Sequence, residues 1–305
     1  SCSIEDLDLA VRAANAAFAT WSRSGLEERK AALQRLHHEL GLRVQPAVEA
    51  LALEMGCPVW LGKLMQVPMP LKGLEFAIEG LDQVQWQERV GNGLVERVAS
   101  GVVGAITPWN FPLHQIIAKV APAIAAGCTI VLKPSEMAPG SARVLAEAVH
   151  AAGLPPGVVN FVWGGARLGE ALVKHPGIDR ISFTGSTAVG RRIMASAAEG
   201  LKPVTLELGG KSAAVLLDDA DLDAAIPVVA RLSLANSGQA CVSQSRLIAP
   251  RKIIPDVVDR LRTAMGQWAL GDPMNEATRL GPVASRTQFD RVNQMVSRAR
   301  EQGGK

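Results

Sequence analysis

Segments with strand character alternate with segments with helix character through most of the middle of this chain. Short apolar runs flanked by turn residues have the pattern of buried strands at residues 102–106, 129–132, 158–162, 178–183, 204–208 and 213–217. Apolar residues at helical spacing separate several of them, over residues 113–126 and 142–152. This order predicts the α/β class with a doubly wound, mostly parallel sheet, which binds ligands at the carboxyl ends of its strands.

The flanking segments predict helices and one hairpin. Helical spacing of apolar residues predicts a first helix from Ile4, a long second helix over residues 26–55, and later helices over residues 221–234, 255–265 and 285–300. Residues 85–98 alternate polar and apolar side chains around Gly91-Asn92-Gly93, the pattern of a hairpin with a tight turn. The chain lacks a G-x-G-x-x-G dinucleotide fingerprint, because Glu96 stands where the third glycine would be.

Composition excludes several functional classes. The net charge of +3 comes from scattered Lys and Arg, which gives no support for nucleic-acid binding. No apolar run is long enough to span a bilayer, and the first twenty residues lack the pattern of a signal peptide. The four cysteines are widely separated, so we expect free thiols, no disulfide, no metal site and a cytoplasmic protein.

A carboxylate and a thiol, each set among glycines, are the strongest candidates for chemistry. Glu207 opens Glu207-Leu208-Gly209-Gly210-Lys211-Ser212, and Cys241 closes Ser237-Gly238-Gln239-Ala240-Cys241. A thiolate is a nucleophile, and a carboxylate can act as a general base in a later step. Either residue alone would more often be a buried thiol or a surface charge, so the argument depends on the two motifs together.

These two motifs, with Thr107-Pro108-Trp109-Asn110-Phe111-Pro112 and Phe183-Thr184-Gly185-Ser186-Thr187, resemble the aldehyde dehydrogenase superfamily. The resemblance extends from about Leu7 to the Gly281-Pro282 region. It implies an NAD-binding domain over residues 1–208 and the N-terminal part of a second α/β catalytic domain over residues 209–305. It also implies that the hairpin 85–98 helps to build a homodimer or homotetramer, although an ordinary surface hairpin is the alternative.

The resemblance implies oxidation of a small-molecule aldehyde to a carboxylic acid. Cys241 would attack the aldehyde, hydride would pass to the cofactor, and Glu207 would activate the water that hydrolyses the thioester. The side-chain amide of Asn110, with the backbone N–H of Cys241, would form the oxyanion hole. Taken by itself, Asn110 would be better explained as a helix cap.

The same resemblance places the cofactor-binding residues at the strand ends. They are Ile106, Thr107, Pro108, Trp109, Lys133, Ser135, Glu136, Gly165, Phe183, Gly185, Ser186, Leu208 and Gly209. An acidic side chain at position 136 would accept hydrogen bonds from the ribose hydroxyls and repel a 2′-phosphate, which favours NAD over NADP. Glycines before a helix can present free N–H groups to phosphate, but they also mark ordinary turns.

The chain departs from the resemblance in its length. Family members extend further at both ends, and the later segment whose glutamate holds the nicotinamide ribose has no counterpart here. Two alternatives to an acid-forming dehydrogenase therefore stay open. One is an inactive chain that binds nucleotide or a partner subunit, and the other is an aldehyde dehydrogenase that passes the acyl group to coenzyme A. The hydrolytic base Glu207 counts against the second.

Overall fold

The structure is a computed structural model in which residues 1–304 are described. The chain divides into two compact units, the first comprising residues 1–48 and 63–208 and the second residues 49–62 and 209–305. The boundary after Leu208 falls within the motif at residues 207–212, where Gly209 and Gly210 follow the last strand of the first unit.

The first unit is built on a five-stranded sheet whose strand order is β5-β4-β3-β6-β7, all parallel. Its strands are β3 (Val102–Ile106), β4 (Thr129–Lys133), β5 (Val159–Phe161), β6 (Arg180–Gly185) and β7 (Val204–Leu208). The prediction of a doubly wound parallel sheet is confirmed. The order reverses beside β3, and such a switch point is where open α/β sheets bind ligands.

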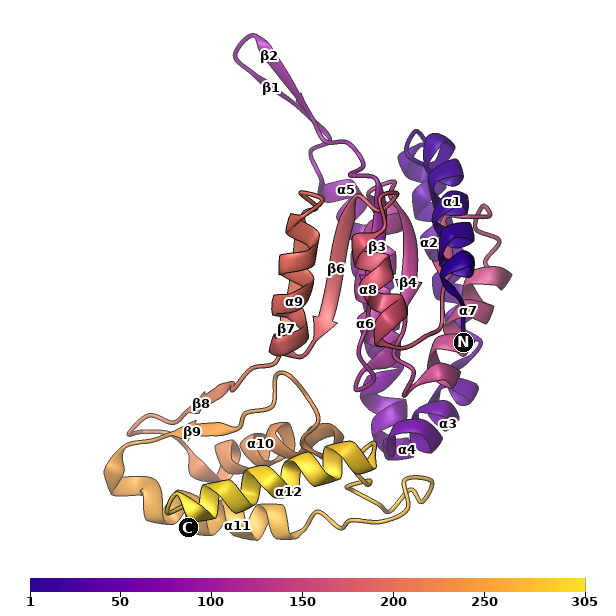
Figure 1. Cartoon of the computed structure of the whole chain (residues 1–305). Coiled ribbons are helices and arrows are strands. Elements are labelled where there is room, and N and C mark those ends of the chain that lie inside the picture. Colours follow the sequence, from indigo (N-terminus) through magenta and orange to yellow (C-terminus); the bar gives the residue numbers. More distant parts are fainter. Residues whose placement is uncertain (305) are drawn as a thin grey trace. The chain divides into compact units, whose positions relative to one another are not determined.

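Helices cover both faces of this sheet (Figure 1). On one face α6 (Pro112–Ala125) and α7 (Pro139–Ala151) pack beneath α2 (Leu26–Gly41) and α5 (Pro68–Gln83). On the other lie α1 (Ile4–Trp21), α8 (Ala166–Lys174) and α9 (Thr187–Ala198). Their apolar stripes are fully buried, as the spacing in the sequence predicts, with Leu7 on α1 and Ile116 on α6 both inaccessible to solvent.

The prediction of one helix over residues 26–55 is wrong. The structure has α2 ending at Gly41 and a separate helix α3 (Val44–Met55). Pro46 is the reason, because in a continuous helix its ring would collide with the carbonyl of Leu42 and its nitrogen could donate no hydrogen bond. In the first turn of α3 the same proline is tolerated.

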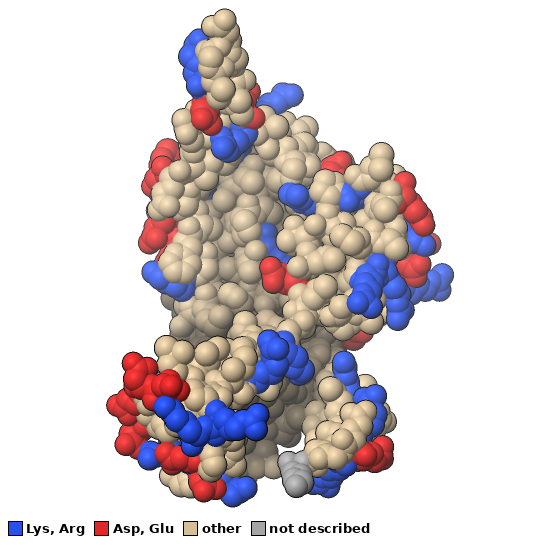
Figure 2. All heavy atoms as spheres, turned by 90° about the vertical axis from the view of Figure 1, so that its left-hand side faces the viewer, with Lys and Arg blue, Asp and Glu red and all other residues tan. Residues whose placement is uncertain are grey.

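The predicted hairpin is present, with β1 (Gln87–Val90) antiparallel to β2 (Gly93–Glu96). Gly91 adopts a φ of +60° in the turn, a conformation that favours glycine. Val90, Leu94, Val95 and Val98 are all exposed on this arm. Charged side chains of both signs occur on the hairpin, whereas the middle of the face that Figure 2 draws carries few of them.

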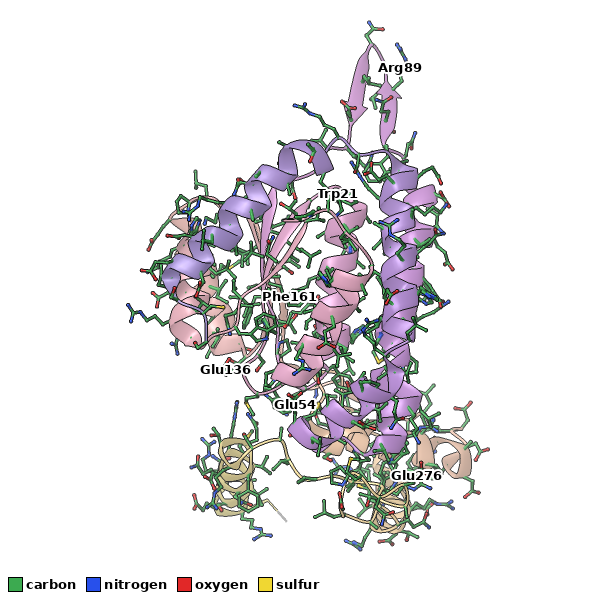
Figure 3. The ribbon with its side chains drawn as sticks, turned by 90° about the vertical axis from the view of Figure 1, so that its right-hand side faces the viewer. Trp21, Glu54, Arg89, Glu136, Phe161 and Glu276 are labelled. Atoms are coloured by element: carbon green, nitrogen blue, oxygen red, sulfur yellow. The ribbon has the colours of Figure 1, made fainter. Side chains whose placement is uncertain are left out.

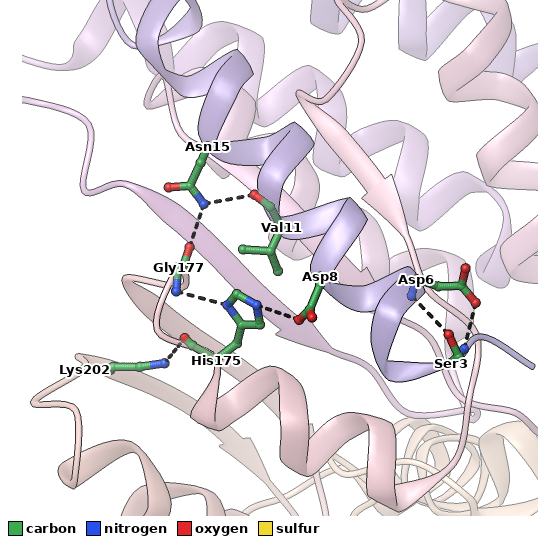
Figure 4. A network of polar contacts seen from close by, with 8 residues as sticks. All are labelled: Ser3, Asp6, Asp8, Val11, Asn15, His175, Gly177 and Lys202. Carbon is green, nitrogen blue, oxygen red and sulfur yellow. Dashed lines mark hydrogen bonds and ion pairs between the residues drawn. The ribbon is translucent and has the colours of Figure 1, made fainter.

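A polar network fastens α1 to the segment that leads into β6 (Figure 4). Gly177 N donates to His175 Nδ1 (3.0 Å), so the ring hydrogen resides on Nε2 and faces Asp8 Oδ1 at 3.0 Å. Asn15 Nδ2 donates to Gly177 O (2.9 Å), and Lys202 Nζ donates to His175 O (2.5 Å). The turn before β6 is therefore held from two sides, which positions the strand that carries the Phe183-Thr184-Gly185 motif.

The second unit has a parallel pair of short strands, β8 (Ala213–Val215) and β9 (Arg246–Ile248), with helices α10 (Leu222–Leu234), α11 (Ile254–Gly266) and α12 (Arg286–Glu301). The short helix α4 (Val59–Leu61) also belongs to it, and a π-helical turn follows (Gly62–Gln66). One of its buried apolar clusters centres on Leu216, Ile226 and Val257. The sequence also predicts a strand over residues 242–249, but only β9 forms there, because residues 242–245 continue the loop that carries Cys241.

We predict that Leu132→Ala lowers the free energy of unfolding by about 2–5 kcal/mol, because Leu132 is completely buried in β4 and truncation would leave a cavity. The matched control is Leu94→Ala on the hairpin, where the side chain is 61% exposed and we expect a change below about 0.5 kcal/mol. Urea unfolding followed by circular dichroism measures both. Equal losses in the two variants would contradict the assignment of β4 to the core.

Candidate functional site

The carboxyl ends of four strands bring most of the predicted cofactor-binding residues to one edge of the first unit. In the β3–β4 ladder Ile106 pairs with Lys133, and in the β3–β6 ladder Ile106 pairs with Phe183. On the far side Gly185 pairs with Leu208 in the β6–β7 ladder. Residues from four separate motifs are therefore neighbours because of backbone hydrogen-bond register alone.

A cavity of about 400 Å³ opens at this edge beside α8 and α9. Its lining is mostly apolar, with Ile106 and Phe183 from the strands and Val173 and Ile193 from the two helices. Lys133 supplies a polar group on the wall. An apolar slot with few polar groups at a topological switch point is a typical binding site for a flat aromatic ligand.

Lys133 is only 5% exposed, but its buried ammonium group has hydrogen-bond partners within the protein. Nζ donates to Gly164 O (2.5 Å) and Pro134 O (3.2 Å) and pairs with Glu136 Oε2 (3.3 Å). Gly169 on α8 leaves room for it, since an added Cβ would lie 3.3 Å from Lys133 Cε. Glu136 lies in the loop after β4 (Figure 3) with its side chain 60% exposed, so its carboxylate is accessible to a ligand.

Lys119 and Thr184 form a second buried polar cluster, which sequence reasoning missed. Lys119 lies on α6 and is 7% exposed, and its Nζ donates to Thr184 Oγ1 at 2.8 Å. Thr184 pairs with Glu207 across the β6–β7 ladder. Burial lowers the pKa of Lys119 to about 8, and the negative charge of Glu207 opposes that shift. A lone lysine within the apolar run 113–126 was the signal that could have revealed it.

The loop between β3 and α6 carries the predicted residues Thr107, Pro108, Trp109 and Asn110. Thr107 N donates to Lys133 O (3.2 Å), which continues the ladder beyond the strand. Thr107 Oγ1 is buried and makes no hydrogen bond within residues 1–304, so it is available to a ligand.

The helix-capping explanation of Asn110 is wrong, because the N-cap of α6 is Phe111. Asn110 lies one residue before that cap, outside the helix. Its backbone oxygen accepts a hydrogen bond from Gln66 Nε2 (3.0 Å), which fixes the loop at this residue.

Two helix N-termini meet the same edge. Ser186 caps α9 by accepting a hydrogen bond from Val189 N (3.4 Å), and Gly165 is the N-cap residue of α8. A Cβ at Gly185 would overlap the Phe183 ring at 2.5 Å, so this position requires glycine. Ser135 and Glu136 follow β4 in the adjoining loop, where Met137 N donates to Ser135 Oγ (3.3 Å).

Cys241 belongs to the second unit, where its side chain is exposed in the loop between α10 and β9. Gly210 passes close beneath it, since an added Cβ there would lie 3.3 Å from the Cys241 carbonyl oxygen. The predicted site residues are thus split: Gly209 and Cys241 lie in the second unit, and the others lie in the first. Glu207 ends up exposed on β7, the edge strand of the sheet.

The other cysteines differ from Cys241 in their surroundings. Cys57 and Cys128 are buried, and burial raises the pKa of Cys57 to about 12. Within residues 1–304 no group of three or more His, Cys, Asp or Glu side chains could hold a metal ion. Over the same residues no helix combines the length and the apolar character needed to cross a membrane.

Comparison with known proteins gives a consistent result. The model of the aldehyde dehydrogenase family matches residues 1–305. A 3-succinoylsemialdehyde-pyridine dehydrogenase from Pseudomonas sp is 42% identical over 303 residues, which cover 99% of this chain and 64% of that protein. A geranial dehydrogenase from Castellaniella defragrans is 41% identical over 302 residues, covering 97% of this chain and 63% of that protein.

Among solved structures, aldehyde dehydrogenase C from Pseudomonas syringae, a cysteine-to-alanine mutant in complex with NAD+ and octanal, aligns with a TM-score of 0.97 and 44% identity. The alignment covers 99% of this chain and 63% of that chain. The present chain therefore spans just under two thirds of the length of the relatives it matches.

We predict that Lys119 makes stability depend on pH in the alkaline range. With a pKa of about 8 in the folded protein and about 10.5 when unfolded, the unfolded chain binds more protons between these values. The free energy of unfolding should therefore rise with pH relative to that of Lys119→Met, by about 1–2 kcal/mol from pH 8 to pH 9.5. Urea titrations at both pH values measure the difference.

The control for this prediction is Lys72→Met, because the Lys72 side chain is 53% exposed. The difference in the free energy of unfolding between Lys72→Met and the parent protein should change by less than about 0.5 kcal/mol over the same pH range. A difference for Lys119→Met that stays flat or falls would show that Lys119 is charged in the folded protein throughout this range.

Proposed function

Because this chain belongs to the aldehyde dehydrogenase family, we propose that the protein oxidises an aldehyde to a carboxylic acid with NAD. The observation that carries the proposal is the ligand-binding edge of the first unit, where Lys133, Glu136 and the apolar cavity lie together. An exposed thiol at Cys241, in a chain whose other motifs match the family throughout, supplies the nucleophile.

The edge of the first unit suits a dinucleotide. The apolar cavity beside α8 and α9 would hold the adenine ring, with Gly165 at the N-cap of α8 on its border. Lys133 and Glu136 would hold the ribose hydroxyls, and the N-terminus of α9 at Gly185 and Ser186 would face the pyrophosphate. The unpartnered Thr107 hydroxyl and the residues Ile106, Pro108, Trp109, Leu208 and Gly209 complete the surface. When bound, NAD supplies the acceptor for the hydride that the aldehyde carbon loses.

The chain's own residues carry the remaining steps. Cys241 as a thiolate forms a carbon–sulfur bond with the aldehyde carbon, which places negative charge on oxygen. The amide of Asn110 and the backbone N–H of Cys241 donate hydrogen bonds to that oxygen. After loss of hydride the acyl group is a thioester on Cys241. Glu207 takes a proton from the water that hydrolyses it, which releases the acid and the free thiol.

Lys119 contributes to this scheme through Glu207. Its Nζ donates to Thr184 Oγ1, and Thr184 pairs with Glu207 in the β6–β7 ladder. A protonated Lys119 therefore places a positive charge near the proposed base, and this charge is lost as the pH rises above the Lys119 pKa of about 8.

The partners we propose are a small aldehyde and further copies of the same chain. The hairpin β1–β2 exposes Val90, Leu94, Val95 and Val98, apolar side chains that suit burial in a homodimer or homotetramer. The four free thiols fit a reducing compartment, so we propose a cytoplasmic location.

We predict that Cys241→Ala abolishes NADH formation, a loss of at least about 10³-fold, while the dissociation constant for NAD changes less than about threefold. The reason is that the thiol reacts with the aldehyde, whereas all the proposed cofactor contacts except Gly209 lie in the first unit. Absorbance at 340 nm with a panel of aldehydes and calorimetric titration of NAD measure the two quantities. Retained turnover would exclude Cys241 as the nucleophile.

The companion variant Glu207→Gln tests the second half of the reaction. We expect one equivalent of NADH to form rapidly per subunit, followed by turnover slowed about 10²–10⁴-fold, because the thioester would lack its general base. Mass spectrometry of the quenched protein should show the acyl group on Cys241. If the parent protein releases the acyl group only when coenzyme A is added, the acid-forming proposal is wrong.

We predict that Glu136→Gln relaxes the choice between NAD and NADP. Removing the carboxylate ends its repulsion of a 2′-phosphate and weakens its hydrogen bonds to the ribose, so the ratio of kcat/KM for NAD to that for NADP should fall about tenfold or more. The control is Glu147→Gln, a half-exposed carboxylate on α7 that pairs only with Arg143 among described residues. An unchanged ratio in Glu136→Gln would remove Glu136 from the cofactor site.

A further inference from the structure

The backbone just before Cys241 is strained. Asn236 and Ser237 have φ values of +54° and +56°, and Gly238 follows with a φ of +74°. Leu201 is the only other non-glycine residue with a positive φ among residues 1–304. Consecutive left-handed residues with side chains are unfavourable, and such strain persists only where surrounding contacts enforce it. The contacts around this turn therefore carry information about its role.

Bonds within the loop hold the turn closed. Gln239 N and Gln239 Nε2 both donate to Asn236 O, at 3.0 and 3.1 Å, and Asn236 Nδ2 donates to Gln239 O at 3.4 Å. Asn236 is 3% exposed, so this local network is shielded from water. At the base of the loop Ser233 Oγ donates to Gln244 O (2.7 Å), which joins the two ends of the segment that contains Cys241.

Two further bonds fasten the loop to a distant segment of the second unit. Ser237 Oγ donates to Gly281 O (2.8 Å), and Ala284 N donates to Gln239 Oε1 (2.9 Å). These partners lie 44 and 45 residues further along the chain. Both anchoring side chains belong to the left-handed turn or to the residue directly after it, so the anchors act on the strained part of the loop.

The anchoring segment is itself tightly held. Gly281 packs so closely on Gly56 that an added Cβ would overlap the Gly56 carbonyl oxygen, and a Cβ at Gly56 would lie 2.7 Å from Pro282. Gly56 has a φ of +71°, so both positions require glycine. The chain before this contact is fixed by hydrogen bonds from Gly271 N to Leu280 O (3.0 Å) and from Leu280 N to Ala269 O (2.9 Å).

We propose that the left-handed turn at residues 236–238, held by Ser237 and Gln239 on the 281–284 segment, fixes the orientation of the Cys241 thiol. Ser237 and Gln239 are thus positioning residues, which act on the thiol through the backbone of the loop. Without its anchors the strained turn relaxes towards ordinary backbone conformations, and Cys241, four residues beyond Ser237, loses its single orientation. The catalytic consequence rests on the function proposed above, whereas the conformational one does not.

Spectroscopy tests the conformational part without any turnover. Cys241 is labelled with a trifluoromethyl ketone reagent, and its ¹⁹F resonance is assigned by its disappearance in Cys241→Ala. We expect one sharp resonance in the parent protein. Gln239→Met, which removes both side-chain hydrogen bonds at similar volume, should give two or more resonances or marked broadening.

Kinetics test the catalytic part. Ser237→Ala removes an anchor and keeps the strain, so the rate of NADH formation in a single turnover should fall about 10–100-fold while the dissociation constant for NAD stays within about twofold. We expect the same loss of rate and the same unchanged dissociation constant in Gln239→Met. The matched control is Ser297→Ala on the exposed face of α12, which should leave both quantities unchanged. Thermal unfolding of every variant verifies that each protein is folded at the temperature of the kinetic measurements.

The proposal is overturned if labelled Gln239→Met gives the single, unshifted resonance of the parent protein. It is equally overturned if Ser237→Ala and Gln239→Met both keep the single-turnover rate of a parent protein that is active. A parent protein without aldehyde oxidation would contradict the proposed function alone, and the ¹⁹F spectra would then decide whether the turn orients Cys241.

Discussion

Parallel pairing of β3 with β4 and β6 is the constraint on which the first unit depends. The register places Ile106 beside both Lys133 and Phe183, and one ladder further it places Thr184 beside Glu207. A slip of one residue in any ladder would move the side chains of a strand to the opposite face of the sheet and shift the candidate site residues relative to their neighbours. Because helices cover both faces, such a slip would disrupt the close packing of residues such as Ile130 and Ile181, both fully buried, and this cost also protects the site.

Two buried ammonium groups show how the same fold treats a charge in different ways. Lys133 is surrounded by two carbonyl oxygens and a carboxylate, so its charge is compensated although its side chain is 5% exposed. Lys119 donates to the Thr184 hydroxyl, a neutral partner, and burial lowers its pKa to about 8. The first lysine suits a permanent ligand contact, whereas the second sits near a protonation equilibrium, beside the carboxylate proposed as the base.

Close backbone contacts and hydrogen bonds fix the loop of the second unit that carries Cys241. One apolar cluster of this unit centres on Leu216, Ile226 and Val257, and α12 contributes no buried residue. The loop with Cys241 is instead tied through Ser237 and Gln239 to a segment locked by the Gly56–Gly281 contact. Directional hydrogen bonds and glycine-only contacts specify a loop conformation more narrowly than apolar packing does, which suits a reactive side chain.

Sequence reasoning determined the class of fold and placed the candidate site residues at the ends of strands. The alternation of apolar strands and helices predicted the parallel sheet, and the motifs at Asn110, Lys133, Ser186 and Glu207 were expected at strand ends because parallel strands align their carboxyl ends. Helical and strand periodicity is a local property, so the sequence alone reveals it. The prediction of a single helix over residues 26–55 is wrong, because the apolar pattern continues through a proline that interrupts the helix.

Tertiary structure alone decided the features that depend on residues far apart in the sequence. The burial of Lys119 against Thr184 arises from the packing of α6 on the sheet, 65 residues from its partner. The left-handed turn before Cys241 is enforced by atoms of residues 281–284. A pKa and a strained φ are set by the surroundings that folding assembles, and no local pattern of residue types specifies those surroundings.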